Sequence, residues 1–135
     1  PLLAEQPSEV VIVNRTAEKA EQLAQAFADL GNIQGGGLAS IDGQFDLVIN
    51  GTSASLSGEL PPLPETLFAK GAWAYDMMYG SEPTVFLQWA GPRGAKLLDG
   101  LGMLVEQAAE SFFLWRNVRP ETASVRTLLR QSLNY

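Results

Sequence analysis

The residues best suited to bind a charged ligand follow the first apolar run of the chain. Val10 to Val13 is a run of β-branched residues typical of a buried parallel strand, and it ends in Asn14, Arg15 and Thr16. At this place in dinucleotide-binding α/β domains a carboxylate bonds the adenosine 2′-hydroxyl, whereas an arginine accommodates a 2′-phosphate. A guanidinium can bind phosphate through two parallel hydrogen bonds, and a threonine at a helix N-cap adds a hydroxyl and helix N–H donors. With Lys19 one turn further on, the pattern favours NADP as cofactor.

The same residues have a second interpretation, which the sequence alone leaves open. A strand, a helix N-cap and a surface arginine without any ligand would have the same sequence. Short motifs of this kind often match by chance, so the segment from Val10 to Thr16 supports the two interpretations about equally.

Composition limits the chemistry. The chain has 135 residues, 46% of them hydrophobic, which is enough for one globular domain with a core. Its net charge of −6 argues against a nucleic-acid partner or an anionic membrane surface, since both need clustered Lys and Arg. The absence of His and Cys removes imidazole bases, thiol nucleophiles and most zinc sites. We therefore predict no metal site and nominate no catalytic residue.

The sequence also bears on location and completeness. No run of 18 apolar residues and no signal peptide is present, so we expect a cytoplasmic protein that does not enter the membrane. The chain begins at Pro1 without Met, and residues 2–6 look like the tail of a helix. We expect a fragment of a longer protein.

The periodicity of apolar residues predicts alternating strands and helices. Strands are expected at about 9–14, 45–50, 73–76 and 96–99, and helices at 17–30, 65–69, 84–90, 101–117 and from Pro120 to about 133. This alternation predicts an α/β fold with a doubly wound parallel sheet of the Rossmann type. Ligands of such sheets bind beyond the carboxyl ends of the strands.

The triple glycine at residues 35–37 resembles a phosphate-binding loop at first sight. It precedes neither a strong strand nor a helix that opens with a Lys, so we predict a flexible connection there instead.

Four strand ends carry small, polar or glycine-containing sequences: residues 14–16, 50–54, 75–79 and 99–108. In this order and spacing they resemble the cofactor domain of shikimate dehydrogenases. The resemblance extends from Val10 to about Val118, and its most specific part is the last segment, which begins Asp99-Gly100-Leu101-Gly102-Met103.

The resemblance implies a role for each strand end. Asn14, Arg15 and Thr16 would hold the 2′-phosphate of NADP, with a contribution from Lys19, which stands where the family often has Arg. The pyrophosphate and nicotinamide-ribose path would be lined by Thr52, Ser53 and Ala54. The nicotinamide would be surrounded by Met77, Gly100 and Met103. The hydroxy-acid substrate would be reached by Tyr79 and Gln107. Met77, Met78 and Met103 could instead be ordinary core filler. Tyr79 could simply cap a loop, and Gln107 could be a partly exposed residue without a function.

The family also has parts that this chain is expected to lack. A first strand with a Gly-rich turn would precede Pro1, as would an N-terminal substrate domain whose Lys and Asp handle the proton. In the strand order 3-2-1-4-5-6 the first strand is central, so its loss would leave strands two and four without their shared neighbour. Such edges favour self-association of the fragment.

The function implied by the resemblance is the NADP-dependent interconversion of 3-dehydroshikimate and shikimate in aromatic amino-acid biosynthesis. Residues 1–135 would be the cofactor-binding part, inactive without the substrate domain. A quinate-type paralogue and a non-catalytic dinucleotide-binding or interaction module remain open. A methyl-donor-binding domain is less compatible with Arg15, because that ligand has no 2′-phosphate.

Overall fold

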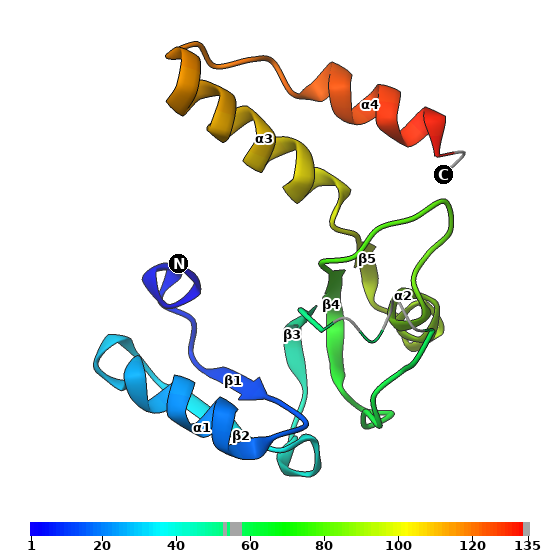
Figure 1. Cartoon of the computed structure of the whole chain (residues 1–135). Helices are drawn as coiled ribbons and strands as arrows, with labels where there is room; N and C mark the ends of the chain where they lie inside the picture. The colour runs from blue at the N-terminus through cyan, green and yellow to red at the C-terminus, as the bar shows by residue number, and fades with distance from the viewer. Residues whose placement is uncertain (53, 55–57, 134–135) are drawn as a thin grey trace. The chain divides into compact units, whose positions relative to one another are not determined.

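The computed structural model describes residues 1–52, 54 and 58–133 of the chain (Figure 1). The chain divides into two compact units. Unit 1 comprises Pro1–Gly43 and Pro61–Leu67, and unit 2 comprises Gln44–Leu60 and Phe68–Tyr135.

Unit 1 is a βαβ unit with short 3-10 turns around it. Strands β1 (Val10–Val13) and β2 (Ile33–Gly36) are parallel, and helix α1 (Ala17–Ala26) connects them. Turns η1 (Leu2–Glu5), η2 (Ala28–Leu30) and η3 (Leu38–Ser40) complete the unit. The predicted strand is confirmed, and the predicted helix ends four residues early because its last turn tightens into η2.

The triple glycine is not a flexible connection, so that prediction was wrong. Gly35 and Gly36 are the last two residues of β2. A Cβ atom on Gly35 would lie 2.2 Å from the backbone oxygen of Ala20, and Ala20 itself is buried on α1. Glycine is therefore required because the helix backbone lies directly against the strand.

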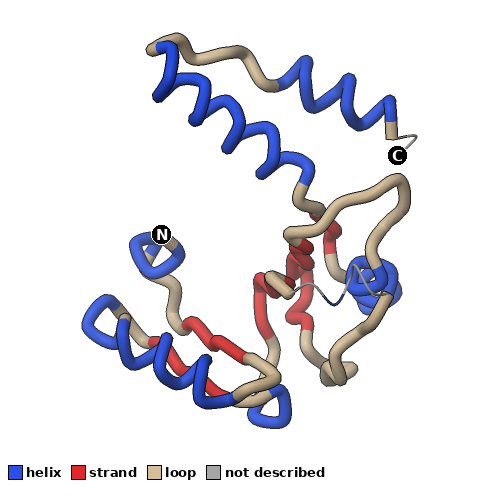
Figure 2. Tube along the Cα trace, in the orientation of Figure 1, coloured by secondary structure: helices blue, strands red, loops and turns tan. Residues whose placement is uncertain are grey.

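Unit 2 contains a parallel sheet in the order β3-β4-β5. Its elements, drawn by type in Figure 2, are β3 (Phe45–Asn50), β4 (Phe68–Asp76), α2 (Val85–Ala90), η5 (Gly91–Arg93), β5 (Lys96–Leu98), α3 (Leu101–Arg116) and α4 (Ala123–Ser132). The alternation of strands and helices confirms the predicted α/β class.

One predicted helix, residues 65–69, is wrong. Phe68 and Ala69 begin β4, which is longer than the predicted strand at 73–76, and Phe68 pairs with Phe45 of β3. Both Leu67 and Phe68 are buried. A short apolar run fits a helix or a strand equally well, and here the pairing with β3 decides the outcome.

The two faces of the unit 2 sheet differ. Ala72 and Ala74 of β4 are buried on the same face as the neighbouring helix α2, whose Phe86 and Leu87 are also buried. On the alternate positions the side chains are partly exposed; these are Leu47, Ile49, Trp73 and Leu98. The core of unit 2 therefore lies between the sheet and α2.

Strands β1 and β3 are each an edge strand of their own sheet. The pairing of β1 with β2, and of β3 with β4 and β5, matches the pairs 2-3 and 4-5-6 of the strand order 3-2-1-4-5-6.

The buried carboxylate of Asp76 joins three segments at the carboxyl end of the unit 2 sheet. It lies at the end of β4 with no solvent exposure and accepts hydrogen bonds from Asn50 Nδ2 (3.2 Å) and Thr84 Oγ1 (2.6 Å). Its other oxygen accepts from the backbone N–H of Met78 at 3.0 Å. Thr84 in turn accepts from Leu87 N–H as the N-cap of α2. Asp76 is therefore a structural residue that fixes the end of β3, the loop after β4 and the start of α2 together.

Among the described residues, no helix is long and apolar enough to cross a membrane.

We predict that Gly35→Ala destabilises the protein by about 1–3 kcal/mol, because the added methyl would overlap the backbone of α1. The matched control is Gly37→Ala, whose Cβ would meet only the Ala17 Cβ at 3.6 Å, an ordinary contact. Urea denaturation measures both variants. Equal stability of the two would contradict the required close approach.

We predict that Asp76→Ala lowers the free energy of unfolding by about 3 kcal/mol or more, since each buried donor left without an acceptor costs about 1–3 kcal/mol. Asp46→Ala, at an exposed position of β3, is the control and should change the free energy by less than about 0.5 kcal/mol. A small effect at Asp76 would show that the three segments hold their positions without it.

Candidate functional site

The candidate site in unit 1 lies where β1 turns into α1. Thr16 is the N-cap of α1, as predicted, and its backbone N–H donates to Asn14 Oδ1 at 2.9 Å. Asn14 is held in turn by its backbone N–H, which donates to the Gly36 oxygen at 3.1 Å. The Thr16 side chain accepts no hydrogen bond from the helix. Its hydroxyl is therefore available to a ligand at the helix N-terminus.

Two cations stand at this turn. Arg15 and Lys19 are both exposed, and among the described residues neither forms an ion pair. The carboxylate of Glu18 lies in the same first turn and offsets part of their charge. An unpaired guanidinium beside a free hydroxyl and a helix N-terminus is a donor set that suits a phosphate dianion. The residues therefore fit the 2′-phosphate of NADP.

The first strand end of unit 2 is the loop after β3. The Thr52 backbone N–H and hydroxyl both donate to Asn50 Oδ1, at 3.1 and 2.8 Å. The Ala54 N–H donates to Thr52 Oγ1 at 3.3 Å. Ser53 lies outside the described residues. Asn50 thus orders Thr52 on one side and contacts Asp76 on the other.

The ends of β4 and β5 meet in unit 2. The Gly100 N–H donates to the Met78 oxygen at 3.1 Å, and the Met77 N–H donates to the Asn50 oxygen at 3.0 Å. A Cβ atom on Gly100 would lie 1.9 Å from the Met77 oxygen, so only glycine fits there. The structure therefore brings together Met77 and Gly100, two of the three residues that the resemblance assigns to the nicotinamide.

Helix α3 begins directly after Gly100. Leu101, Val105 and Ala109 form its buried stripe. Met103 is 36% exposed, and Gln107 is exposed one turn further on. Residues four apart on a helix share a face, so Met103 and Gln107 lie along one exposed stripe near the start of α3.

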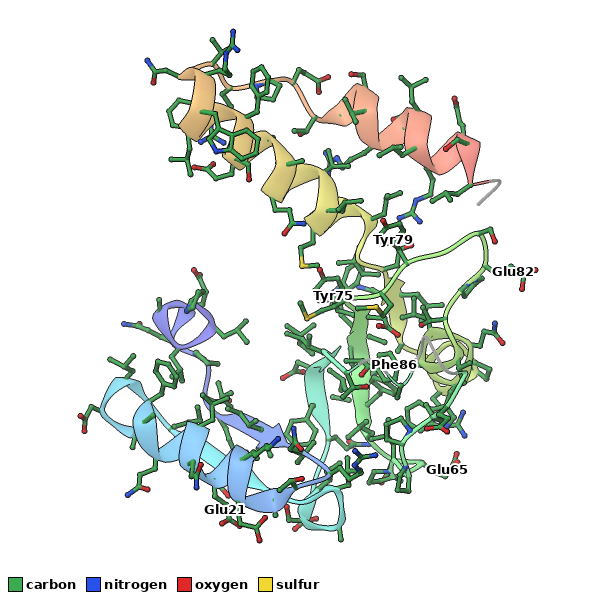
Figure 3. The ribbon with its side chains drawn as sticks, viewed as in Figure 1. Glu21, Glu65, Tyr75, Tyr79, Glu82 and Phe86 are labelled. Atoms are coloured by element: carbon green, nitrogen blue, oxygen red, sulfur yellow. The ribbon has the colours of Figure 1, made fainter. Side chains whose placement is uncertain are left out.

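Tyr79 belongs to the loop after β4. It is 42% exposed, and Figure 3 labels it in that loop. Because the side chain is exposed, the phenol is accessible to a ligand. Tyr79 directly follows Met77 and Met78 in the chain.

Sequence reasoning missed one interaction at this edge of the sheet. Asp99, at the end of β5, is buried and accepts from both terminal nitrogens of Arg130 on α4, at 2.5 and 2.6 Å. Its Oδ1 also accepts from the Leu101 backbone N–H at 3.2 Å. No local sequence pattern predicts this pair, because its two residues are 31 positions apart in the sequence.

The pKa of Tyr75, which lies on β4, is shifted by burial and by the nearby Asp99. Partial burial, and then the negative charge of Asp99, raise the pKa of the Tyr75 phenol above its ordinary value. The phenol is therefore neutral at physiological pH and is no candidate for a general base.

Two surface hollows lie away from the strand-end residues of the candidate site. One of about 450 Å³ lies along α4, between residues that include Arg126, Thr127 and Arg130, and another of about 190 Å³ is apolar and lies in unit 1 beside Phe27 and Leu30. None of the predicted site residues lines either hollow. We identify the candidate site from the strand ends because their chemistry is specific.

In the part of the chain that the structure describes, no cluster of three or more His, Cys, Asp or Glu could hold a metal ion.

Comparison with known proteins agrees with the motif at the start of α3. Residues 100–130 match the family model described as the Shikimate 5'-dehydrogenase C-terminal domain. A protein of Chromohalobacter salexigens named "Shikimate dehydrogenase (NADP(+))" is 64% identical over 133 residues, which are 98% of this chain and 49% of that protein.

Solved structures give the same result. The crystal structure of an Ael1 enzyme from Pseudomonas putida superimposes with a TM-score of 0.83 at 46% identity, covering 91% of this chain and 46% of that one. Shikimate 5-dehydrogenase from Thermus thermophilus, in complex with NADP(H) and shikimate, has a TM-score of 0.72 at 28% identity, covering 96% and 48%. These matches confirm the predicted Rossmann-like class.

The chain spans about half the length of the curated relatives it matches. Its resemblance to them extends over nearly all of its own residues and includes every strand end described above. By sequence and fold, this chain is similar to about half of each of these shikimate dehydrogenases, and its residues 100–130 match the model of their C-terminal domain.

Proposed function

We propose that residues 1–135 are the NADP-binding part of an enzyme that interconverts 3-dehydroshikimate and shikimate. The observation that carries this proposal is the 64% identity, over 98% of the chain, to a protein named shikimate dehydrogenase (NADP(+)). Since the chain covers 49% of that relative, the activity belongs to the full-length gene product. We propose the cytoplasm as its location.

The 2′-phosphate of NADP binds at the start of α1 in this proposal. Arg15 supplies the guanidinium, and the Thr16 hydroxyl and the amide of Asn14 supply neutral donors. Lys19 adds a second positive charge one turn along the helix. The support is that Arg15 has no ion-pair partner among the described residues and that the Thr16 hydroxyl does not cap its own helix.

The nicotinamide end of the cofactor binds in unit 2. The predicted contacts are Thr52, Ser53 and Ala54 along the ribose path and Met77, Gly100 and Met103 around the ring. Support comes from the backbone contact of Gly100 with Met77 and Met78, which brings the ends of β4 and β5 together.

The substrate contacts in this chain are Tyr79 and Gln107. Both side chains are exposed and able to hydrogen-bond to the hydroxyl or carboxylate groups of a cyclic hydroxy acid. The Thermus thermophilus relative was solved with shikimate bound, which supports a substrate of this class.

The bound cofactor supplies the hydride acceptor in the oxidative direction. When shikimate is oxidised, the carbinol carbon loses a hydride and the hydroxyl loses a proton to a general base. We assign no base within this chain, because Asp76 and Asp99 are both engaged in structural hydrogen bonds. In this proposal the residues of this chain bind and orient the cofactor and the substrate.

We predict that Arg15→Ala in the full-length gene product weakens NADPH binding by about 1.5–3 kcal/mol, because a charge-assisted pair with the 2′-phosphate is lost. NADH has no 2′-phosphate, so its affinity should change by less than about twofold. Fluorescence titration of both cofactors measures the difference.

The control for this prediction is Lys70→Ala, which removes an exposed positive charge of β4 and should leave the affinity for both cofactors unchanged. Equal weakening of NADPH and NADH by Arg15→Ala would refute the assignment of the 2′-phosphate.

We predict that Gln107→Ala raises KM for shikimate about tenfold or more, since a polar substrate group loses its partner. NADPH affinity should stay within about twofold of the parent value. Steady-state kinetics with a separate cofactor titration distinguish the two effects, and Gln25→Ala, on the exposed surface of α1, is the control. A large loss of NADPH affinity would place Gln107 at the cofactor instead of the substrate.

A further inference from the structure

Arg130 reaches from the last helix to the carboxyl end of the unit 2 sheet. Its two terminal nitrogens bind the two carboxylate oxygens of Asp99 in parallel, at 2.5 and 2.6 Å. The Asp99 side chain is 4% exposed and the Arg130 side chain 32% exposed. A bidentate pair of this kind fixes both position and orientation, which a single contact between flexible side chains does not.

The partner of Arg130 controls the junction between β5 and α3. Asp99 accepts the backbone N–H of Leu101 and so holds the first turn of α3. Gly100, between them, donates its N–H to the Met78 oxygen and lies against the Met77 backbone. A rotation of the Asp99 side chain would therefore be transmitted to the two segments that carry the proposed nicotinamide contacts.

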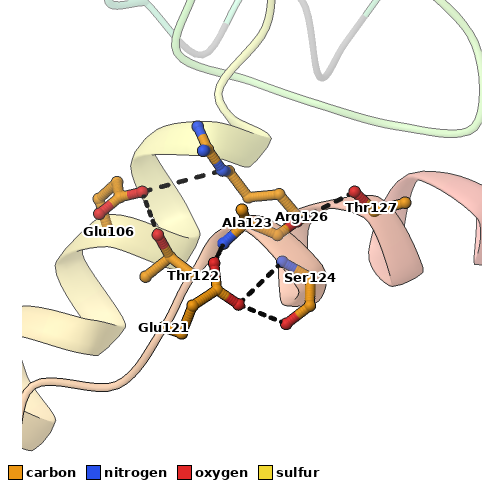
Figure 4. Close-up of polar contacts among 7 residues, drawn as sticks. All are labelled: Glu106, Glu121, Thr122, Ala123, Ser124, Arg126 and Thr127. Carbon is orange, nitrogen blue, oxygen red and sulfur yellow. Dashed lines mark hydrogen bonds and ion pairs between the residues drawn. The ribbon is translucent and has the colours of Figure 1, made fainter.

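A second attachment holds the other end of α4 to α3 (Figure 4). Glu106 accepts from the Thr122 hydroxyl at 2.8 Å and lies 3.8 Å from Arg126. Glu121 caps the start of α4 by accepting from the Ser124 N–H and hydroxyl. The Glu106 and Arg126 side chains are about half exposed, 54% and 49%, so this ion pair is weak.

The two attachments of α4 hold different parts of unit 2. The one at Glu106 and Thr122 sets where α4 begins on α3, whereas the one at Arg130 is the buried contact that reaches the strand end. Loss of Arg130 would leave the Asp99 carboxylate buried without its cation, and the junction would have to rearrange to solvate it.

We propose that Arg130 is a positioning residue for hydride transfer: by clamping Asp99, it holds Gly100 and the first turn of α3 in register with Met77. Arg130 touches neither cofactor nor substrate in this account. The proposal rests on the proposed function for its catalytic readout, whereas its mechanical part concerns the β5–α3 junction alone.

The test compares Arg130→Met with Arg126→Met in the full-length gene product. Both variants remove one guanidinium from α4, four residues apart, and only the first removes the buried pair. Arg130→Met should lower kcat at saturating NADP⁺ and shikimate by about tenfold or more, because a small misplacement of reacting groups is costly. The NADPH-to-NADH affinity ratio should not change, and Arg126→Met should stay within about twofold of the parent in kcat.

Amide hydrogen exchange supplies a readout that does not require turnover. In Arg130→Met, peptides covering residues 99–107 should exchange at least about fivefold faster than in the parent, while peptides of unit 1 remain unchanged. In an Asp99→Asn background, Arg130→Met should have little further effect on kcat, because the arginine acts through that carboxylate.

The outcomes separate the two proposals. A kcat for Arg130→Met equal to that of Arg126→Met, or additive effects with Asp99→Asn, would overturn the positioning role and leave the proposed function intact. Failure of the parent to bind NADPH would refute the proposed function, and hydrogen exchange alone would then decide on the clamp. If Arg130→Met does not fold, Arg130→Lys decides: it keeps the charge without the parallel pair, so an unchanged kcat and unchanged exchange would overturn the proposal.

Discussion

The carboxyl edge of the unit 2 sheet depends on the buried carboxylate of Asp76. Three donors from separate segments converge on it: Asn50 at the end of β3, Thr84 at the start of α2 and the backbone of Met78. A buried charge is tolerated only when donors surround it, so these segments are fixed in relation to one another. The backbone at Met77 and Met78 is then placed to meet Gly100, and the candidate nicotinamide contacts follow from that arrangement.

The strand ends of the two units have different chemistry. The start of α1 combines exposed cations with a free hydroxyl, within a chain whose net charge is −6. The acidic net charge disfavours binding of polyanions, so these two cations suit a small anion better than a nucleic acid. The ends of β4 and β5 instead contact each other through the backbones of Met77 and Gly100 and carry methionine side chains.

The sequence predicted what local patterns determine. The β-branched run before Asn14 predicted β1, and the helical spacing of apolar residues after Ala17 predicted α1. The Asp99-to-Met103 motif predicted the turn from β5 into α3. Other features depend on contacts between distant residues. Gly35 is needed because α1 packs against it, β4 extends back to Phe68 because β3 pairs with it, and the Arg130–Asp99 pair has no local signal.

A crystal structure of the full-length gene product with NADP⁺ bound tests the central claim most directly. Our account predicts that the 2′-phosphate oxygens lie about 3 Å from the Arg15 guanidinium and within hydrogen-bond distance of the Thr16 hydroxyl. A bound NADP⁺ whose 2′-phosphate lies in solvent or against other cations, with Arg15 pointing away, would contradict it.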